Sequence, residues 1–214
     1  MPARRRRAMN HLAHLQLSDG PDERLGNLLG DHVRGRLQPG DWPPGVYRGL
    51  HLHRRIDSLA DHHPAARTLR ARFPNGERRC AGILLDLCHD HFLIRHWTVL
   101  QDQPLADWVR RVYRELADRR PDMPAPLQQR LPTLIERDWL RACSDLEGVE
   151  RVLARVAGRL RRPEPLLRAG ARLRQLYPDL ERCFLALYPD IRASVAHERV
   201  RVRDGWCAER PPAR

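Results

Sequence analysis

The sequence contains no lysine. All 39 of its basic residues are arginine, a bias that we attribute to codon usage in a GC-rich genome. The excess of base over acid is a separate property, because the chain has a formal net charge of +12 at pH 7. A charge of this sign predicts an acidic partner, which is a nucleic acid, an anionic membrane or an acidic protein.

Paired cysteines and long apolar runs are also absent. The five cysteines form no Cys-x-x-Cys pair and lie mostly in apolar periodic runs, which predicts reduced, buried thiols. No apolar run approaches the roughly 18 residues that span a bilayer. The arginine run at 4–7 is followed by polar residues and not by the apolar core of a secretory signal. We therefore expect a cytoplasmic protein that does not bind membranes.

Several catalytic motifs are missing as well. The chain has no glycine-rich phosphate loop and no Gly-x-Ser-x-Gly nucleophile turn. No cysteine has neighbours that would activate it as a nucleophile.

The apolar pattern is helical throughout. No stretch alternates as a strand would, so the sequence predicts an all-α, single-domain multi-helix bundle. We place a disordered basic leader at 1–8, the helical domain at 9–198 and a flexible tail at 199–214. Ser144 to Glu147 predicts a capping box with Ser144 as the N-cap. Pro178 predicts a boundary between helices at 166–177 and 180–196.

The first candidate site lies in the predicted helix Leu50 to Asp61. His53 and Asp57 are four residues apart, and Asp61 follows four residues later, so all three share one helix face. In a second helix, Leu84 to Trp97, Asp86 and Asp90 repeat this spacing, with His91 beside them. Two such helices in contact would form a cluster of imidazoles and carboxylates.

Imidazole and carboxylate ligands without thiolate suit manganese, iron, magnesium or zinc in a hydrolytic site. The spacing alone is also compatible with ordinary capping, salt bridging or solvation of these residues. Arg34, Arg54 and Arg55 flank the cluster, and guanidinium groups are suited to phosphate oxygens. In so arginine-rich a chain, a solvated basic face is the simpler interpretation of these three residues.

Four motifs in order connect these residues to a known family. They are Asn10 to Leu15, Gly26 to Gly35, His51 to Asp61, and Asp86 to Leu93 followed by His96-Trp97. From Met9 to about His197 the chain resembles the acyl carrier protein phosphodiesterases. Enzymes of that family remove 4′-phosphopantetheine from holo acyl carrier protein and leave the apo form. They are considered distant relatives of the HD-type metal-dependent phosphohydrolases, which implies a similar helical fold here.

The resemblance also bears on single residues. The positions at which the family motifs carry the same residue are His14, Asp31, His53, Asp57, Asp86, Asp90 and His91. It implies a divalent metal, manganese being expected first, with magnesium, iron or cobalt as alternatives. We expect the metal ligands to be His14, Asp31, His53, Asp57 and Asp90.

The remaining roles follow from the same resemblance. His91, Asp57 and Asp90 are the expected catalytic residues, with His91 either completing the metal site or protonating the leaving group. Arg34, Arg54 and Arg55 would neutralise the phosphate. Asp86 and Asp61 would support the ligands from behind. The expected partner is holo acyl carrier protein, an acidic protein, and not nucleic acid; the sequence leaves the oligomeric state open.

Two other functions stay open at the level of sequence. A generic HD-like nucleotide phosphohydrolase could use the same metal face on small phosphodiesters. A basic helical nucleic-acid-binding protein would use the arginines on phosphates and hold the His and Asp residues for structural reasons alone. The two central helices carry acidic residues among their basic ones, and this argues against nucleic-acid binding.

Overall fold

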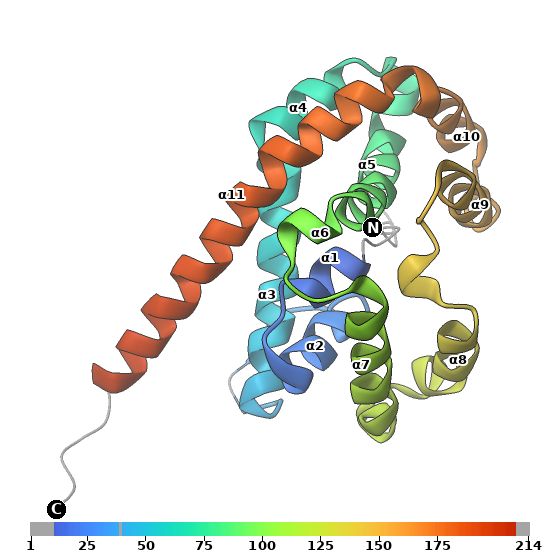
Figure 1. The fold of residues 1–214 in the computed structure, drawn as a ribbon. Helices are drawn as coiled ribbons and strands as arrows, with labels where there is room; N and C mark the ends of the chain where they lie inside the picture. The colour runs from blue at the N-terminus through green and yellow to red at the C-terminus, as the bar shows by residue number, and fades with distance from the viewer. Residues whose placement is uncertain (1–10, 39, 209–214) are drawn as a thin grey trace, which may run out of the picture.

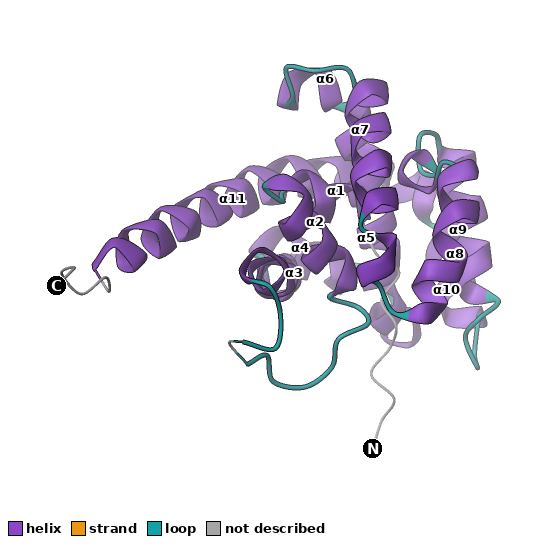
Figure 2. Ribbon diagram, turned by 90° about the horizontal axis from the view of Figure 1, so that it is seen from below, coloured by secondary structure: helices purple, strands orange, loops and turns teal. Residues whose placement is uncertain are grey.

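The structure, a computed structural model, describes residues 11–38 and 40–208, and the backbone alone over 200–208. This part of the chain forms helices and no strands (Figures 1 and 2), which confirms the all-α prediction. The predicted leader at 1–8 lies outside the described residues. The helices are α1 (His11–Gln16), α2 (Gly20–Leu29), α3 (Pro44–His62), α4 (Pro64–Ala71), α5 (Asn75–Arg95), α6 (Trp97–Leu100), α7 (Leu105–Asp118), α8 (Ala125–Glu136), α9 (Leu146–Ala157), α10 (Glu164–Ala171) and α11 (Leu173–Ala208), with 3₁₀ turns η1 (Arg120–Asp122) and η2 (Trp139–Arg141).

Glycines bring α2 and α3 unusually close together. A Cβ atom added at Gly26 would lie 2.0 Å from the carbonyl oxygen of Val46, and one added at Gly49 would lie 2.1 Å from that of Glu23. At Gly30 an added Cβ would lie 2.1 Å from Cγ of His53. Only glycine permits this approach, and it holds the end of α2 against the polar face of α3.

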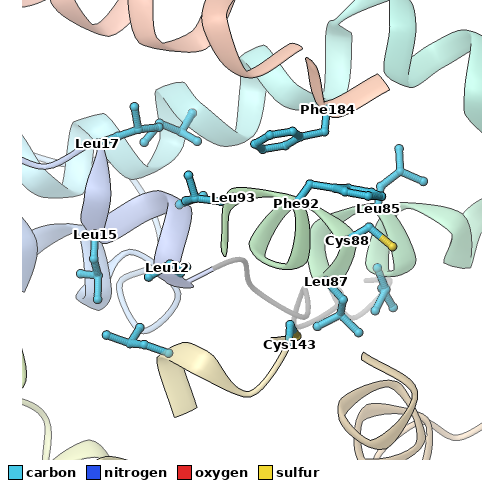
Figure 3. Packing of buried hydrophobic residues seen from close by; sticks show 14 of the residues in the cluster. Leu12, Leu15, Leu17, Leu85, Leu87, Cys88, Phe92, Leu93, Cys143 and Phe184 are labelled. Carbon is cyan, nitrogen blue, oxygen red and sulfur yellow. The ribbon is translucent and has the colours of Figure 1, made fainter. Parts of the chain in front are cut away.

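Helix α5 is the centre of the bundle. It is buried on several faces, as expected of a helix whose apolar residues are not confined to one stripe. Figure 3 shows its Phe92 and Leu93 between Leu12 of α1 and Phe184 of α11. The ring centroids of Phe92 and Phe184 are 6.0 Å apart. This packing places α1, which is only six residues long, at a fixed position against α5.

The predicted helix boundary at Pro178 is wrong. Helix α11 begins at Leu173 and continues through Pro178 and Pro189, and α8 likewise contains Pro132. A proline inside a helix removes one hydrogen bond and costs about 3 kcal/mol. Burial of Leu176, Leu180 and Phe184 along the same face of α11 offsets that cost.

Two further local predictions differ from the structure. The N-cap of α9 is Asp145, whose side chain accepts a hydrogen bond from the Gly148 amide at 2.6 Å, and not Ser144. Aspartate and serine cap about equally well, so sequence alone could not choose between two adjacent residues. Helix α11 extends to Ala208, so 199–208 are helical where a flexible tail is predicted.

The cysteines whose side chains are described agree with the prediction. Cys80, Cys88, Cys143 and Cys183 are buried free thiols. Burial raises the pKa of the Cys183 thiol to about 11, and it also raises the pKa of the Cys88 and Cys143 thiols. Among the described helices, none combines the length and apolarity required to cross a membrane.

Candidate metal centre

A buried polar cluster lies where α1, α2 and α3 meet. His14 comes from α1, Asn27 from α2, and His53 and Asp57 from α3, while Asp31 lies just beyond the end of α2. The two imidazole rings face each other with centroids 4.4 Å apart. The structure therefore brings together four residues that the sequence predicts as metal ligands, three of them distant in the chain from His14.

Asn27 fixes the orientation of both histidines. Its Nδ2 donates to the carbonyl oxygen of His14 at 2.9 Å and to Oγ of Ser18 at 2.8 Å. The amide oxygen of Asn27 is therefore the atom that faces the two imidazole rings. That oxygen lies 2.8 Å from Nδ1 of His14 and 3.2 Å from Nδ1 of His53. Because an amide oxygen only accepts, both Nδ1 atoms must carry the proton.

In the neutral form of each ring, Nε2 therefore carries the lone pair, and it faces a carboxylate. Nε2 of His14 lies 3.4 Å from Oδ1 of Asp57, and Nε2 of His53 lies 3.7 Å from Oδ2 of Asp57. Nε2 of His53 also lies 3.6 Å from Oδ1 of Asp31. Neutral imidazole lone pairs and carboxylate oxygens repel one another, so this arrangement calls for a cation or a proton between them.

The donor set fits a divalent cation. Ligand atoms about 2.1 Å from a metal stand roughly 3.0–3.4 Å from one another, close to the separations seen here. Histidine ligands typically donate the other ring nitrogen to an oxygen, which Asn27 provides for both rings. As placed, no three His, Cys, Asp or Glu side chains of the described residues form a group that could hold a metal ion. The side chains of Asp31 and Asp57 are 25 % and 31 % exposed.

Asp90 is buried beside the cluster and holds α1 in place. Its carboxylate accepts hydrogen bonds from the backbone amides of Leu12 at 3.3 Å and Ala13 at 3.0 Å. Burial raises the pKa of Asp90 to about 7, although these two hydrogen bonds oppose the rise. The sequence predicts Asp90 as a ligand and catalytic residue, whereas its contacts here are those of a residue that positions His14.

The structure does not bring His91 to the cluster. Its Nδ1 donates to the carbonyl oxygen of Cys143 at 2.9 Å, and its Nε2 accepts from the hydroxyl of Tyr177 at 2.9 Å. Burial lowers the pKa of His91 below its usual value. These contacts join α5 to the turn before α9 and to α11, so the predicted catalytic role of His91 has no geometric support among the described contacts.

Two further carboxylates, Asp61 and Asp86, are predicted to support the ligands. Asp61 forms an ion pair with Arg70 of α4 at 3.2 Å. Asp86 is half-buried on α5, where its charge helps to raise the pKa of the Cys88 thiol.

Arg54 is one of the three arginines predicted to bind phosphate. It follows His53 on α3, and its guanidinium lies 3.5 Å from the carbonyl oxygen of Val33, in the loop that also carries Asp31. Arg55 points to α11, where it pairs with Glu198 at 3.4 Å. Arg34 is exposed in the loop after α2.

A cleft of about 650 Å³ opens beside Arg54. It is lined by Arg36, Leu37, Gln38, Tyr47, His51 and Arg54. Tyr47 and His51 stack one turn apart on α3, with ring centroids 4.5 Å apart. The cleft thus combines cationic and aromatic groups, and Arg54 in its lining follows His53 in the chain.

Sequence reasoning missed Asn27, Arg36 and Tyr47. Asn27 lies four residues before Asp31, so helical spacing could have placed the two on one face. An amide carries no charge and is common on solvated helix faces, which explains why it gave no signal. Arg36 lies in a Pro- and Gly-rich loop, and Tyr47 lies just after that loop. The course of such a loop cannot be derived from periodicity.

Comparisons with known proteins point to one family. A family model described as acyl carrier protein phosphodiesterase matches residues 9–191. Proteins named acyl carrier protein phosphodiesterase from Salmonella paratyphi A (strain ATCC 9150 / SARB42) and Escherichia coli O139:H28 (strain E24377A / ETEC) are each 38 % identical over 192 residues. One from Shigella boydii serotype 18 is 37 % identical over 192 residues. Each alignment covers 89 % of this chain and 99 % of the relative. No solved structure matches the chain.

Proposed function

Because this chain belongs to the acyl carrier protein phosphodiesterase family, we propose that it hydrolyses the phosphodiester between 4′-phosphopantetheine and the serine of holo acyl carrier protein. The products are apo carrier protein and free 4′-phosphopantetheine. The chain is a hydrolase on the strength of this membership. One observation supports the site assignment: Nε2 of His14 and Nε2 of His53 each lie near an oxygen of the Asp57 carboxylate.

His14, Asp31, His53 and Asp57 are the residues that would hold a divalent cation, with manganese expected first. Such a cation, when bound, supplies Lewis-acid polarisation of the phosphate and lowers the pKa of water to near neutrality. The matching of an imidazole and carboxylate donor set to manganese, magnesium or iron supports this proposal.

The protein's own contribution is preorganisation. The shared contact with Asn27 keeps both imidazoles in one tautomer and prevents their rotation. The two oxygens of Asp57 face one histidine each, so this carboxylate spans the centre of the cluster. Asp90 fixes the helix that carries His14. These restraints keep the donors in place before the substrate binds. Preorganised groups of this kind lower the activation barrier of a reaction by electrostatic stabilisation of its transition state.

Arg54 would neutralise the phosphate charge as it is redistributed in the transition state. The cleft lined by Arg36, Tyr47 and His51 begins at the same residue. Its volume of about 650 Å³ suits an extended arm with amide groups, and we assign it to the pantetheine portion of the substrate.

Intact-mass analysis tests this function. Holo carrier protein is incubated with the protein and Mn²⁺, with EDTA, and with the Asp57→Asn variant; Asp107→Asn, which alters an exposed carboxylate on α7, is the matched control. The expected result is loss of the whole 4′-phosphopantetheine mass, abolished by EDTA and by Asp57→Asn and retained in the control. An unchanged carrier mass across several carriers and metals would refute the proposal, as would a product that keeps phosphate on the serine.

A further inference from the structure

A second cleft, of about 410 Å³, lies between α8 and α9. Both views place these two helices on the side of the molecule away from the free end of α11 (Figures 1 and 2). Its basic lining consists of Arg130, Arg137, Arg151, Arg155 and Arg159, and none of the described lining residues is acidic. We call this the arginine groove.

Few of the groove arginines are neutralised by a carboxylate. Several arginines elsewhere on the surface are, as Arg95 is by Glu181 at 3.1 Å and Arg174 by Glu150 at 3.1 Å. In the groove, Arg151 lies 3.7 Å from Asp145. The other four have no ion pair with any described residue. A codon bias explains why these residues are arginine, but it does not explain why unpaired ones gather in one groove.

The floor of the groove is apolar. Leu134 of α8 and Val152 of α9 line it, together with Trp139 of η2. A groove with an apolar floor and cationic rims fits a protein helix that carries carboxylates beside an apolar ridge.

The groove adjoins the candidate metal centre. The Trp139 ring contacts His11 edge to face, with centroids 6.1 Å apart. His11 and His14 are three residues apart on α1, so one helical turn separates the groove wall from the cluster. The reacting phosphodiester is attached directly to the carrier's serine, so the carrier surface must lie against a wall of the metal centre.

We infer that the arginine groove is the docking site for an acidic helix of the carrier protein. This inference rests on the proposed function, since it takes the carrier as substrate. The carrier then approaches from α8 and α9, while the pantetheine arm extends from the cluster past Arg54 on the opposite side. Complementary charge steers the encounter and weakens binding as salt increases.

The test measures binding separately from catalysis. Apo acyl carrier protein, which lacks the arm, is titrated against the full chain carrying Arg155→Glu and Arg159→Glu. The matched control carries Arg67→Glu and Arg192→Glu, two exposed arginines on α4 and α11, and changes the net charge equally. Circular dichroism and hydrolysis of bis(4-nitrophenyl) phosphate with Mn²⁺ establish that each variant is folded and retains its metal centre.

The expected result is a Kd for apo carrier raised about tenfold or more in the groove variant, and changed less than about twofold in the control. The KM for holo carrier should rise in parallel, with hydrolysis of the small diester unchanged. Equal Kd values for the two variants would overturn the docking site even if phosphopantetheine is released. Groove-dependent binding without any release would instead overturn the proposed function and leave the docking site standing. Loss of binding to a fluorescent DNA duplex, but not to apo carrier, in the groove variant would show a nucleic-acid surface and also overturn the inference.

Discussion

At the residue scale, Asn27 carries more of the site's geometry than any charged group. Replacing it by leucine removes the acceptor shared by His14 and His53, so both rings can rotate and change tautomer. We expect Asn27→Leu to weaken Mn²⁺ binding about 10- to 100-fold. The measurement is a titration of free Mn²⁺ by electron paramagnetic resonance.

Asn27→Asp is the control, because it retains an oxygen acceptor for both imidazoles and should bind Mn²⁺ far better than the leucine variant. A folded Asn27→Leu protein with wild-type Mn²⁺ affinity would contradict the assigned role.

His89 gives a prediction about acid stability. It is 4 % exposed, and its Nε2 has no hydrogen-bond partner among the described residues. Burial lowers the pKa of His89 from 6.5 to about 4. As pH falls below 6.5 the unfolded chain takes up a proton that the folded chain refuses until about pH 4, so His89 costs stability on acidification.

His89→Phe should therefore reduce the loss of unfolding free energy between pH 8 and pH 5 by about 2 kcal/mol. Phenylalanine keeps the aromatic contact with Phe184, whose ring centroid lies 6.2 Å away. Urea denaturation at the two pH values measures the difference. The same loss in both proteins would show that His89 is not buried in the neutral form.

At the element scale, the close contact of α2 and α3 determines whether the site forms. An alanine at Gly49 would direct its Cβ at the Glu23 carbonyl from 2.1 Å, and the helices would have to separate. We expect Gly49→Ala to lower the free energy of unfolding by about 1–3 kcal/mol. Gly82→Ala on α5 is the matched control, since an added Cβ there meets nothing within 4 Å.

Gly82→Ala should raise stability by about 0.5–1 kcal/mol, because alanine is the better helix former. Chemical denaturation of both variants distinguishes tight helix packing from a general effect of glycine in helices. Equal effects of the two substitutions would contradict the packing argument.

Local spacing predicts some elements well and others poorly. The helical period gave the all-α fold, and the four-residue spacing put His53 and Asp57 on one face of α3. The same reasoning paired α3 with α5 across the site, whereas α3 meets α1 and the end of α2. Which helix faces another depends on contacts such as that of Gly30 with His53. The sequence does not show which residue a glycine will contact.

Buried hydrogen bonds set a similar limit. Asp90 and His91 are adjacent on α5, yet Asp90 binds the backbone of α1 while His91 contacts the turn before α9 and Tyr177 of α11. Their roles differ because their side chains leave α5 in different directions. His14 and Asp31 are candidates on other predicted helices, and no spacing rule could connect them to α3.

At the scale of the whole molecule, the arginines that give the net charge of +12 fall into two groups, those in ion pairs between helices and those that line the two openings. Ion pairs such as Arg24 with Glu115 at 2.6 Å and Arg172 with Glu77 at 2.8 Å join helices to one another. The groove between α8 and α9 and the cleft beside Arg54 have arginines available for substrate. The two openings suit a substrate with a protein at one end and a flexible arm at the other.

The central claim is that the junction of α1, α2 and α3 is the metal centre of this hydrolase. Anomalous diffraction from a crystal grown with Mn²⁺ tests it most directly. We predict a manganese peak about 2.0–2.3 Å from Nε2 of His14, Nε2 of His53 and a carboxylate oxygen of Asp57, and absent from the Asp57→Asn crystal. A peak at another place in an enzyme that requires Mn²⁺ would contradict the account.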